Sequence, residues 1–300
     1  MIDTQTAFDR YESLRDALPS ATFPTRSQTG RDLSDTTAHY DAYILDAFGV
    51  LNRGETAIEG AVERIADLRA AGKRLIVLTN AASYTRVDIL AKYHRFGFDF
   101  TADDVVSSRD VAFANLPKLA DGKVWAAISA EGDDFSDTPA SANIEDLIAN
   151  PDLFGTAGGF LFLSTARWID TDTAALSQAL KANPRPLVVA NPDLVAPRED
   201  GLTIEPGIIA HDILAQTGTD AVFYGKPYDN AFESALARLD GIPRHRIAMV
   251  GDTLHTDVLG GAAAGIGTIL ITDHGLFKGF DVAPYIKLSG IQPDWIISTT

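Results

Sequence analysis

The sequence predicts an α/β fold in which one doubly wound domain with a parallel sheet encloses a second, inserted α/β domain. Short apolar runs alternate with amphipathic helical segments from Tyr40 onward, and this alternation is interrupted once before it resumes. A length of 300 residues is enough for about two domains, each with its own core. We expect an N-terminal helix and connector over residues 1–39, a core formed by 40–107 and 204–300, and an insert over 108–203.

The N-terminal segment predicts one helix and no chemistry. Residues 4–18 carry apolar side chains at helical spacing, and Pro19 follows them, so we expect an amphipathic helix that packs on the core. Residues 20–37 are rich in Ser, Thr, Pro and Gly and have no apolar period, which is typical of a connector.

The core begins with a strand, a helix and a parallel strand. The predicted elements are a strand at 43–45, a helix at 58–68, a strand at 75–78, a helix at 87–96 and a strand at 105–106. Strand-like runs at 124–128, 160–163 and 187–190 then belong to the insert. After it, Pro206 opens a helix, and we expect the core sheet to resume with strands at 221–224, 247–250 and 268–271.

Composition excludes several classes of function. The absence of cysteine removes disulfides, thiolate metal sites and cysteine nucleophiles. A formal charge of -16 repels nucleic acid and anionic lipid, so we expect neither as a partner. The first 18 residues contain four acids and no long apolar run, which fits neither a signal peptide nor a membrane span, and we expect a soluble cytoplasmic protein.

Polar side chains follow four of the predicted core strands. Asp46 follows the first strand and Thr79 the second, Lys226 follows the run 221–224, and Asp252 and Asp257 follow the run 247–250. Taken singly, each side chain is explained as a helix cap, a turn residue or a solvated charge. Ligands of open parallel sheets bind at the carboxyl ends of the strands, so together these residues predict one site.

The carboxylates of this set predict a magnesium site. Asp46, Asp252 and Asp257 would repel one another unless a cation neutralised them, and hard oxygen ligands select Mg²⁺. Asp46 can then attack phosphorus as a nucleophile.

The remaining polar groups predict phosphoryl transfer. The Thr79 hydroxyl and the backbone amides near Asn80 and Ala81 can donate to the nonbridging oxygens of a phosphate. Lys226 can offset the charge that develops in the transition state.

The four loops, in this order and spacing, resemble the motifs of the haloacid dehalogenase superfamily. The segments that carry the resemblance are Asp46-Ala47-Phe48-Gly49-Val50, Thr79-Asn80, Gly225-Lys226-Pro227 and Gly251-Asp252-Thr253-Leu254-His255-Thr256-Asp257. The insert resembles the cap of class IIA, which contains N-acetylglucosamine-6-phosphate, pyridoxal phosphate and 4-nitrophenyl phosphatases. The resemblance runs from about residue 40 to residue 272 and implies a Rossmann-like core with an inserted cap.

The resemblance also implies roles for individual residues. Asp46 is the implied nucleophile, Thr79 the phosphate-binding hydroxyl, Lys226 the charge-balancing lysine and Asp252 a metal ligand. The backbone carbonyl of Phe48 is implied as a further Mg²⁺ ligand, a role that any side chain at this position permits.

One departure from the family pattern concerns Phe48. Members that hydrolyse ordinary esters usually carry an Asp two residues after the nucleophile, where it acts as general acid and base. Losing such a group costs roughly 3–5 kcal/mol of transition-state stabilisation, so aryl and acyl phosphates should suffer least. His255 is either a replacement acid or the cap of the following helix.

Two further residues are candidate substrate contacts. Arg53 follows the first motif and is either a substrate contact or a surface charge. Asn191 begins an Asn-Pro-Asp segment that resembles the family's turn near the cap edge, although turn chemistry alone also explains it.

These observations predict a Mg²⁺-dependent phosphatase of a small phosphorylated metabolite, acting through an aspartyl-phosphate and atypical at Phe48. The alternative is a catalytically impaired regulatory protein that binds metal and phosphate. A dehalogenase is a third reading, which Asp252 disfavours because dehalogenases need no second metal-binding carboxylate. The sequence leaves the oligomeric state open, a homo-oligomer included.

Overall fold

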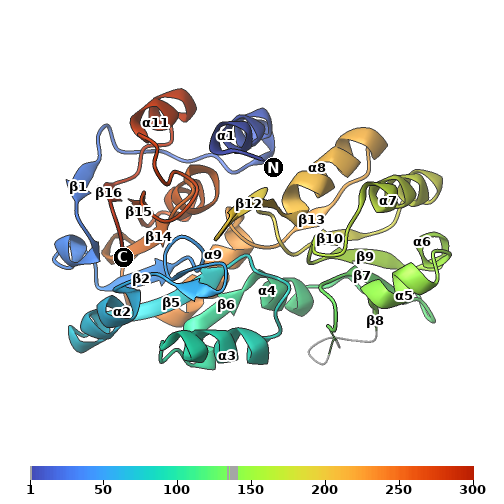
Figure 1. The fold of residues 1–300 in the computed structure, drawn as a ribbon, viewed down its shortest axis with the longest axis horizontal. Helices are drawn as coiled ribbons and strands as arrows, with labels where there is room; N and C mark the ends of the chain where they lie inside the picture. The colour runs from blue at the N-terminus through green and yellow to red at the C-terminus, as the bar shows by residue number, and fades with distance from the viewer. Residues whose placement is uncertain (1, 134, 136–140) are drawn as a thin grey trace.

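A computed structural model describes residues 2–133, 135 and 141–300 and contains two separate parallel sheets that lie side by side (Figure 1). The larger sheet has seven strands in the order β1-β16-β15-β14-β2-β5-β6. Its strands are β1 (Gln28–Gly30), β2 (Ala42–Leu45), β5 (Arg74–Thr79), β6 (Val105–Ser107), β14 (Ile247–Gly251), β15 (Gly267–Ile271) and β16 (Trp295–Ile297). We call this sheet with its helices the core.

Helices cover both faces of the core sheet, as the doubly wound prediction requires. Alternate residues of β2 point to opposite faces: Tyr43 packs with α2 (Ala61–Ala70) and α3 (Arg86–Phe96), whereas Ile44 packs with α9 (Asp229–Leu236). The same second face also holds α4 (Ser108–Ala114) and α10 (Leu259–Ala263), and α11 (Ala283–Ser289) packs near α1. Because both faces are covered, the central strands are apolar at every position.

The smaller sheet, with its helices, forms the insert and has the order β13-β10-β9-β7-β8. Its strands are β7 (Trp125–Ile128), β8 (Ser141–Ala142), β9 (Gly159–Phe162), β10 (Leu187–Val189) and β13 (Val222–Phe223). Its helices are α5 (Ile144–Ala149), α6 (Leu153–Thr156), α7 (Asp170–Ala182) and α8 (Pro206–Thr217). An antiparallel hairpin, β11 (Val195–Arg198) and β12 (Gly201–Ile204), extends from the insert toward the core.

The strand at 221–224 belongs to the insert, which corrects the sequence prediction that it resumes the core sheet. β13 pairs in parallel with β10, with Val188 opposite Val222. The reason is that the preceding α8 buries Ala210 and Ile213 in the core of the insert, so the chain returns to the insert sheet. The predicted boundary at 203 and 204 therefore does not separate the two sheets, and the insert sheet extends to Phe223.

The connector predicted over 20–37 also contains a strand. β1 pairs in parallel with β16, with Gln28 opposite Trp295, and forms one edge of the core sheet. Its sequence Gln-Thr-Gly has no apolar residue because an edge strand of three residues can remain largely exposed.

The N-terminal helix α1 (Thr4–Ser13) lies across the junction between core and insert. Toward the core, the Thr4 hydroxyl donates to the Leu276 carbonyl at 2.9 Å and Phe8 packs edge-on against Tyr285. Three contacts reach the insert: Ile2 bridges Leu202, the Leu194 amide donates to the Tyr11 hydroxyl at 3.1 Å, and Arg10 forms an ion pair with Asp212. The packing role predicted for this helix is confirmed. None of the described helices combines the length and apolarity needed to cross a bilayer.

Candidate active site

Three carboxylates and one lysine meet at the carboxyl edge of the core sheet. Asp46 continues β2, since its amide donates to the Val250 carbonyl at 2.8 Å. Lys226 Nζ lies 2.5 Å from Asp46 Oδ1 and 2.7 Å from Asp257 Oδ1. One carboxylate oxygen from each of Asp46, Asp252 and Asp257 lies within 4.8 Å of the others, and all three residues are buried. The predicted convergence of these loops is therefore seen in the structure.

Local backbone geometry fixes Asp252 and Asp257. The Leu276 amide donates to Asp252 Oδ2 at 2.6 Å, and the Thr253 amide donates to Asp257 Oδ2 at 3.1 Å. Asp257 lies in a π-helical turn, Leu254–Val258, an irregularity common at functional sites. Gly49 has a φ of +79°, and a Cβ there would lie 2.7 Å from Asp252 Cγ, so only glycine lets the first loop approach this carboxylate.

Burial dominates the electrostatics of the cluster. It raises the pKa of Asp46 to about 7, although Lys226 counteracts this shift. Burial, with the charges of Asp257 and Asp46, raises the pKa of Asp252 to about 8. Burial by itself would lower the pKa of Lys226, but the neighbouring charges of Asp257 and Asp46 reverse the shift and raise it.

This donor set fits a magnesium ion. The cluster brings together three buried carboxylates with one lysine, which leaves excess negative charge that a divalent cation would neutralise. Burial is the main cause of the raised pKa values of Asp46 and Asp252, and the negative charge of Asp257 adds to both shifts. All three side chains offer hard oxygen ligands, which Mg²⁺ prefers.

The loop after β5 holds the insert to the core through Asn80. Its side-chain amide donates to Asp193 Oδ1 at 2.8 Å and to the Lys226 carbonyl at 2.9 Å, and its Oδ1 accepts from the Lys226 amide at 2.8 Å. The side chain predicted to contact substrate is thus engaged in positioning Lys226. Next to it, the Ala81 amide donates to Thr79 Oγ1 at 3.1 Å, so two of the predicted phosphate donors lie together.

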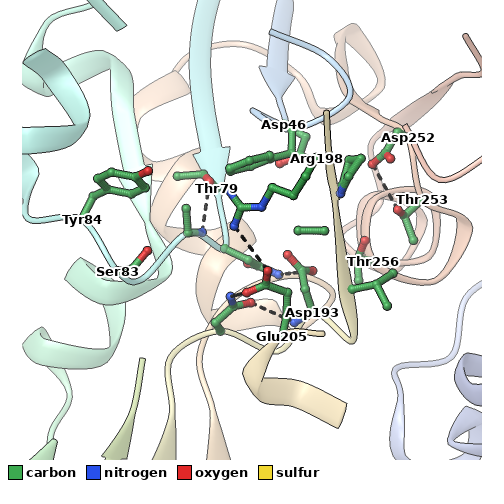
Figure 2. Close-up of a pocket in the computed structure, with 17 residues that line it drawn as sticks. Asp46, Thr79, Ser83, Tyr84, Asp193, Arg198, Glu205, Asp252, Thr253 and Thr256 are labelled. Atoms are coloured by element: carbon green, nitrogen blue, oxygen red, sulfur yellow. Dashed lines mark hydrogen bonds and ion pairs between the residues drawn. The ribbon is translucent and has the colours of Figure 1, made fainter. Parts of the chain in front are cut away.

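A small pocket of about 30 Å³ lies between the core and the hairpin of the insert (Figure 2). Its lining includes seven of the predicted residues: Asp46, Phe48, Thr79, Asn80, Ala81, Asn191 and Asp252. From the insert come Asp193, Arg198 and Glu205, which the sequence did not single out. Burial raises the pKa of Asp193 well above its usual range and also raises the pKa of Glu205.

Phe48 lies in the pocket between two cations. Its ring centroid is 5.0 Å from Lys92 Nζ, which comes from α3, and 4.8 Å from Arg198 Cζ, which comes from β11. Lys92 is itself paired with Glu55 at 2.7 Å. The aromatic ring therefore contacts core and insert where the family pattern has a carboxylate.

Lys226 and Asp257 lie behind the pocket lining, and two further predicted residues, His255 and Arg53, also lie outside it. His255 is fully buried, its Nε2 contacts Glu12, and its ring stacks on Tyr11 at 5.0 Å. Burial lowers the pKa of His255 to about 4, and neither the acid nor the helix-cap interpretation matches its contacts with α1. Arg53 lies in a short hairpin, β3 (Asn52–Arg53) with β4 (Thr56–Ala57), and is not among the residues that line the pocket.

The sequence offered different signals for the residues that were missed. Asp193 belongs to the Asn-Pro-Asp segment, whose first residue was selected, so its place near the site could have been inferred. Arg198 and Glu205 lie in or beside the β11–β12 hairpin, which reaches the site only because the insert packs against the core. No local pattern of the chain indicates that packing.

Comparisons with known proteins agree with this geometry. Residues 43–137 match the family of haloacid dehalogenase-like hydrolases, and residues 223–298 match a related HAD-hydrolase-like family. The acid sugar phosphatase of Staphylococcus epidermidis is 25% identical over 231 residues, which are 77% of this chain and 86% of that protein.

Solved structures show the same fold. A possible sugar phosphatase of the HAD superfamily from Cytophaga hutchinsonii has a TM-score of 0.76 at 26% identity, over 91% of this chain and 98% of that chain. Glycerol phosphate phosphatase from Mycobacterium tuberculosis, solved in complex with magnesium, has a TM-score of 0.64 at 24% identity, over 88% and 76% of the two chains.

Proposed function

The chain belongs to the haloacid dehalogenase-like hydrolases, and on this premise we propose that it is a Mg²⁺-dependent phosphatase of a small phosphorylated metabolite. The observation that carries the proposal is the Asp46 carboxylate, held 2.5 Å from Lys226 Nζ and beside Asp252 and Asp257. This arrangement combines a nucleophile, a fixed cation and a divalent-metal site in one buried cluster.

Asp46 is the nucleophile of the proposed reaction. Its Oδ forms a bond to phosphorus while the bond from phosphorus to the leaving oxygen breaks, which produces an aspartyl-phosphate. Water then attacks that phosphorus, the bond to Asp46 Oδ breaks, and inorganic phosphate leaves with the carboxylate restored. Asp46, Asp252 and Asp257, with the Phe48 carbonyl, would hold a Mg²⁺ ion, which would supply charge stabilisation for the phosphoryl oxygens.

The other residues position and stabilise the phosphoryl group. Lys226 offsets negative charge on Asp46 throughout the reaction because its Nζ contacts that carboxylate directly. In the structure, the Ala81 amide donates a hydrogen bond to the Thr79 hydroxyl. When substrate is bound, both groups donate to phosphoryl oxygens instead. Thr79 and Lys226 are thus assigned the roles that the family resemblance implies.

Phe48 makes the reaction depend on the leaving group. A phenyl ring cannot donate a proton to the departing oxygen or activate water, and among the described residues no histidine lines the pocket in its place. Leaving groups that are stable as anions, such as aryl alcohols or carboxylic acids, need this help least. We therefore propose turnover of aryl and acyl phosphates that exceeds turnover of alkyl phosphates.

A second candidate is a regulatory protein that binds metal and phosphate without appreciable turnover. Phe48 favours it, because the same cluster remains able to bind a phosphorylated ligand after the acid is lost. The two candidates differ in whether inorganic phosphate is released repeatedly.

The deciding experiment measures phosphate release by wild type and Phe48→Asp, with Mg²⁺ and with EDTA, from phosphates of graded leaving-group basicity. The phosphatase proposal expects Mg²⁺-dependent release from 4-nitrophenyl and acetyl phosphate by wild type. It also expects a gain of about 10²-fold or more for Phe48→Asp on alkyl phosphates. No release by wild type, together with activity created by Phe48→Asp, would establish the regulatory candidate, and no release by either protein would refute the phosphatase.

A further inference from the structure

We propose that Arg198 determines specificity by binding a second anionic group on the substrate, so that the preferred substrates are phosphate esters whose leaving group carries a carboxylate or another phosphate. The inference rests on the proposed function and extends it to the class of substrate. The residue comes from the insert and enters the pocket beside Phe48, which is two positions after the nucleophile (Figure 2).

Among the described residues that line the pocket, Arg198 is the one with a basic side chain. The other charged residues of the lining are all acids: Asp46, Asp193, Glu205 and Asp252. Lys226 lies behind the lining and is already in contact with Asp46 and Asp257. The phosphoryl group would meet the metal site and Lys226, so Arg198 is the cation that remains for a second anion.

The contacts of Arg198 leave hydrogen-bond donors for a ligand. Its Nη2 lies 3.4 Å from Glu205 Oε1 and its Nε lies 3.4 Å from Thr203 Oγ1, both long for a charged donor. The guanidinium has five N–H donors, and the Arg198 side chain is 34% exposed to solvent. Its planar fork matches a carboxylate or phosphate in a bidentate arrangement.

Phe48 places this charge on the leaving-group side of the site. The guanidinium carbon lies 4.8 Å from the ring centroid of Phe48, and Lys92 lies 5.0 Å from the same centroid. Lys92 is neutralised by Glu55 at 2.7 Å and is not part of the pocket lining, so it does not compete for the ligand. Phe48, which stands where the family has its general acid, thus packs against the Arg198 guanidinium on the side from which the leaving group departs.

The small volume of the pocket brings a bound substrate close to Arg198. The cavity of about 30 Å³ holds little more than a water molecule while Arg198 extends across it. A substrate bound in this cavity would therefore lie beside the guanidinium or displace it. Because displacement would leave Glu205 without its nearest cation in a buried position, an anion that binds the guanidinium in place is favoured.

The test compares 3-phosphoglycerate with glycerol 3-phosphate, which share a three-carbon frame and differ by a carboxylate in place of a hydroxymethyl group. Each is measured as a competitive inhibitor of 4-nitrophenyl phosphate hydrolysis in Mg²⁺ buffer. We expect wild type to bind 3-phosphoglycerate about 10- to 100-fold more tightly. Arg198→Met should bring the ratio of inhibition constants close to one, and Arg198→Lys should retain part of the preference.

Arg167→Met is the matched control, because Arg167 is an exposed arginine of the insert that pairs with Glu131 and does not line the pocket. This variant should keep the wild-type ratio. Two results overturn the inference: a wild type without preference, or an Arg198→Met protein that weakens both ligands by the same factor, as a structural role would.

Failure of the proposed function is distinguishable from failure of this inference. If wild type hydrolyses no phosphate ester, the phosphatase proposal fails, and calorimetric titration of the same two ligands into the Mg²⁺-loaded protein then tests the preference without turnover. An equal affinity for both ligands in that titration would remove Arg198 as a specificity determinant.

Discussion

At the scale of single residues, the site depends on one buried ammonium group among carboxylates. Lys226 is 1% exposed and contacts Asp46 and Asp257, while Asn80 fixes its backbone from both sides. A buried charge is tolerated only when its partners are close and themselves held in place. The same contacts that stabilise the fold therefore hold the cluster in the arrangement needed for phosphoryl transfer.

Lys226→Met tests this coupling between stability and activity. Removing the cation leaves Asp46 and Asp257 without their closest partner, so we expect the free energy of unfolding to fall by about 3–5 kcal/mol. We also expect phosphate release to fall by at least about 100-fold. Urea unfolding and phosphate assays measure the two effects, with the exposed Lys181→Met as the control, which should change stability by less than about 0.5 kcal/mol. Wild-type stability in Lys226→Met would show that the lysine is not balancing buried charge.

Residues at the ends of core strands were predictable because parallel strands deliver them to one edge. Asp46, Thr79 and Asp252 are examples, and their catalytic roles stay predictions. Lys226 was also selected as a strand-end residue, although the strand before it lies in the insert sheet. Arg198 could not be predicted, since nothing in the hairpin sequence indicates that it crosses to the core. His255 follows a core strand but contacts Glu12, and only the packing of α1 reveals this.

At the scale of elements, α1 connects the two parts of the molecule. It bonds to the core through Thr4 and to the insert through Tyr11 and Arg10. Tyr11 accepts a hydrogen bond from the amide of Leu194, which directly follows the pocket residue Asp193 in the sequence. The helix therefore restrains the segment that carries the pocket residues of the insert.

The double change Arg10→Met and Tyr11→Phe should loosen that restraint. Two of the three contacts to the insert are lost, while the Ile2–Leu202 bridge and the core-facing Phe8 remain, so we expect faster amide hydrogen exchange over residues 191–204. Gln5→Ala, which removes a surface hydrogen bond to Asp9 within the same helix, is the control and should leave that exchange unchanged. Equal exchange in the double variant and wild type would show that α1 does not hold the insert.

Helix α8 gives a pH-dependent prediction through His211. Burial lowers the pKa of His211, the charge of Arg10 adds to the shift, Asp212 opposes it, and the ring stacks on Phe223 at 4.8 Å. Because the folded pKa is lower than the unfolded value of about 6.5, the unfolded chain binds more protons in acid. His211 therefore costs stability as pH falls through about 6.5. We expect His211→Phe to reduce the decline of Tm between about pH 7 and pH 5, and an identical decline would contradict this account.

Elements with a strong apolar pattern were predicted well, and those without one were not. The buried strands β2, β5 and β14 read directly from their apolar runs. β1 was missed because its three residues are polar or glycine. β13 was found but placed in the wrong sheet, because short apolar strands carry no information about which neighbour they pair with.

At the scale of the whole molecule, three of the 41 acidic residues come together in one buried cluster. Folding brings Asp46, Asp252 and Asp257 within 4.8 Å, a state that a divalent cation stabilises and the unfolded chain does not reproduce. Metal binding and stability are therefore linked.

Magnesium should raise the melting temperature of the whole protein. At 100 times the dissociation constant, binding contributes about 2.7 kcal/mol, which corresponds to several degrees for a chain of this size. Differential scanning calorimetry in Mg²⁺ and in EDTA measures the shift, with NaCl at matched ionic strength as the control. Asp252→Asn should abolish most of the shift, since it removes one charged ligand. A NaCl effect as large as that of Mg²⁺ would indicate screening rather than a site.

The most direct measurement is the mass of the protein quenched in acid during turnover of 4-nitrophenyl phosphate with Mg²⁺. The account predicts a phosphoryl adduct on the peptide that contains Asp46, labile to hydroxylamine and absent from Asp46→Asn. Phosphate release without any adduct at Asp46, or release that persists in Asp46→Asn, would contradict it.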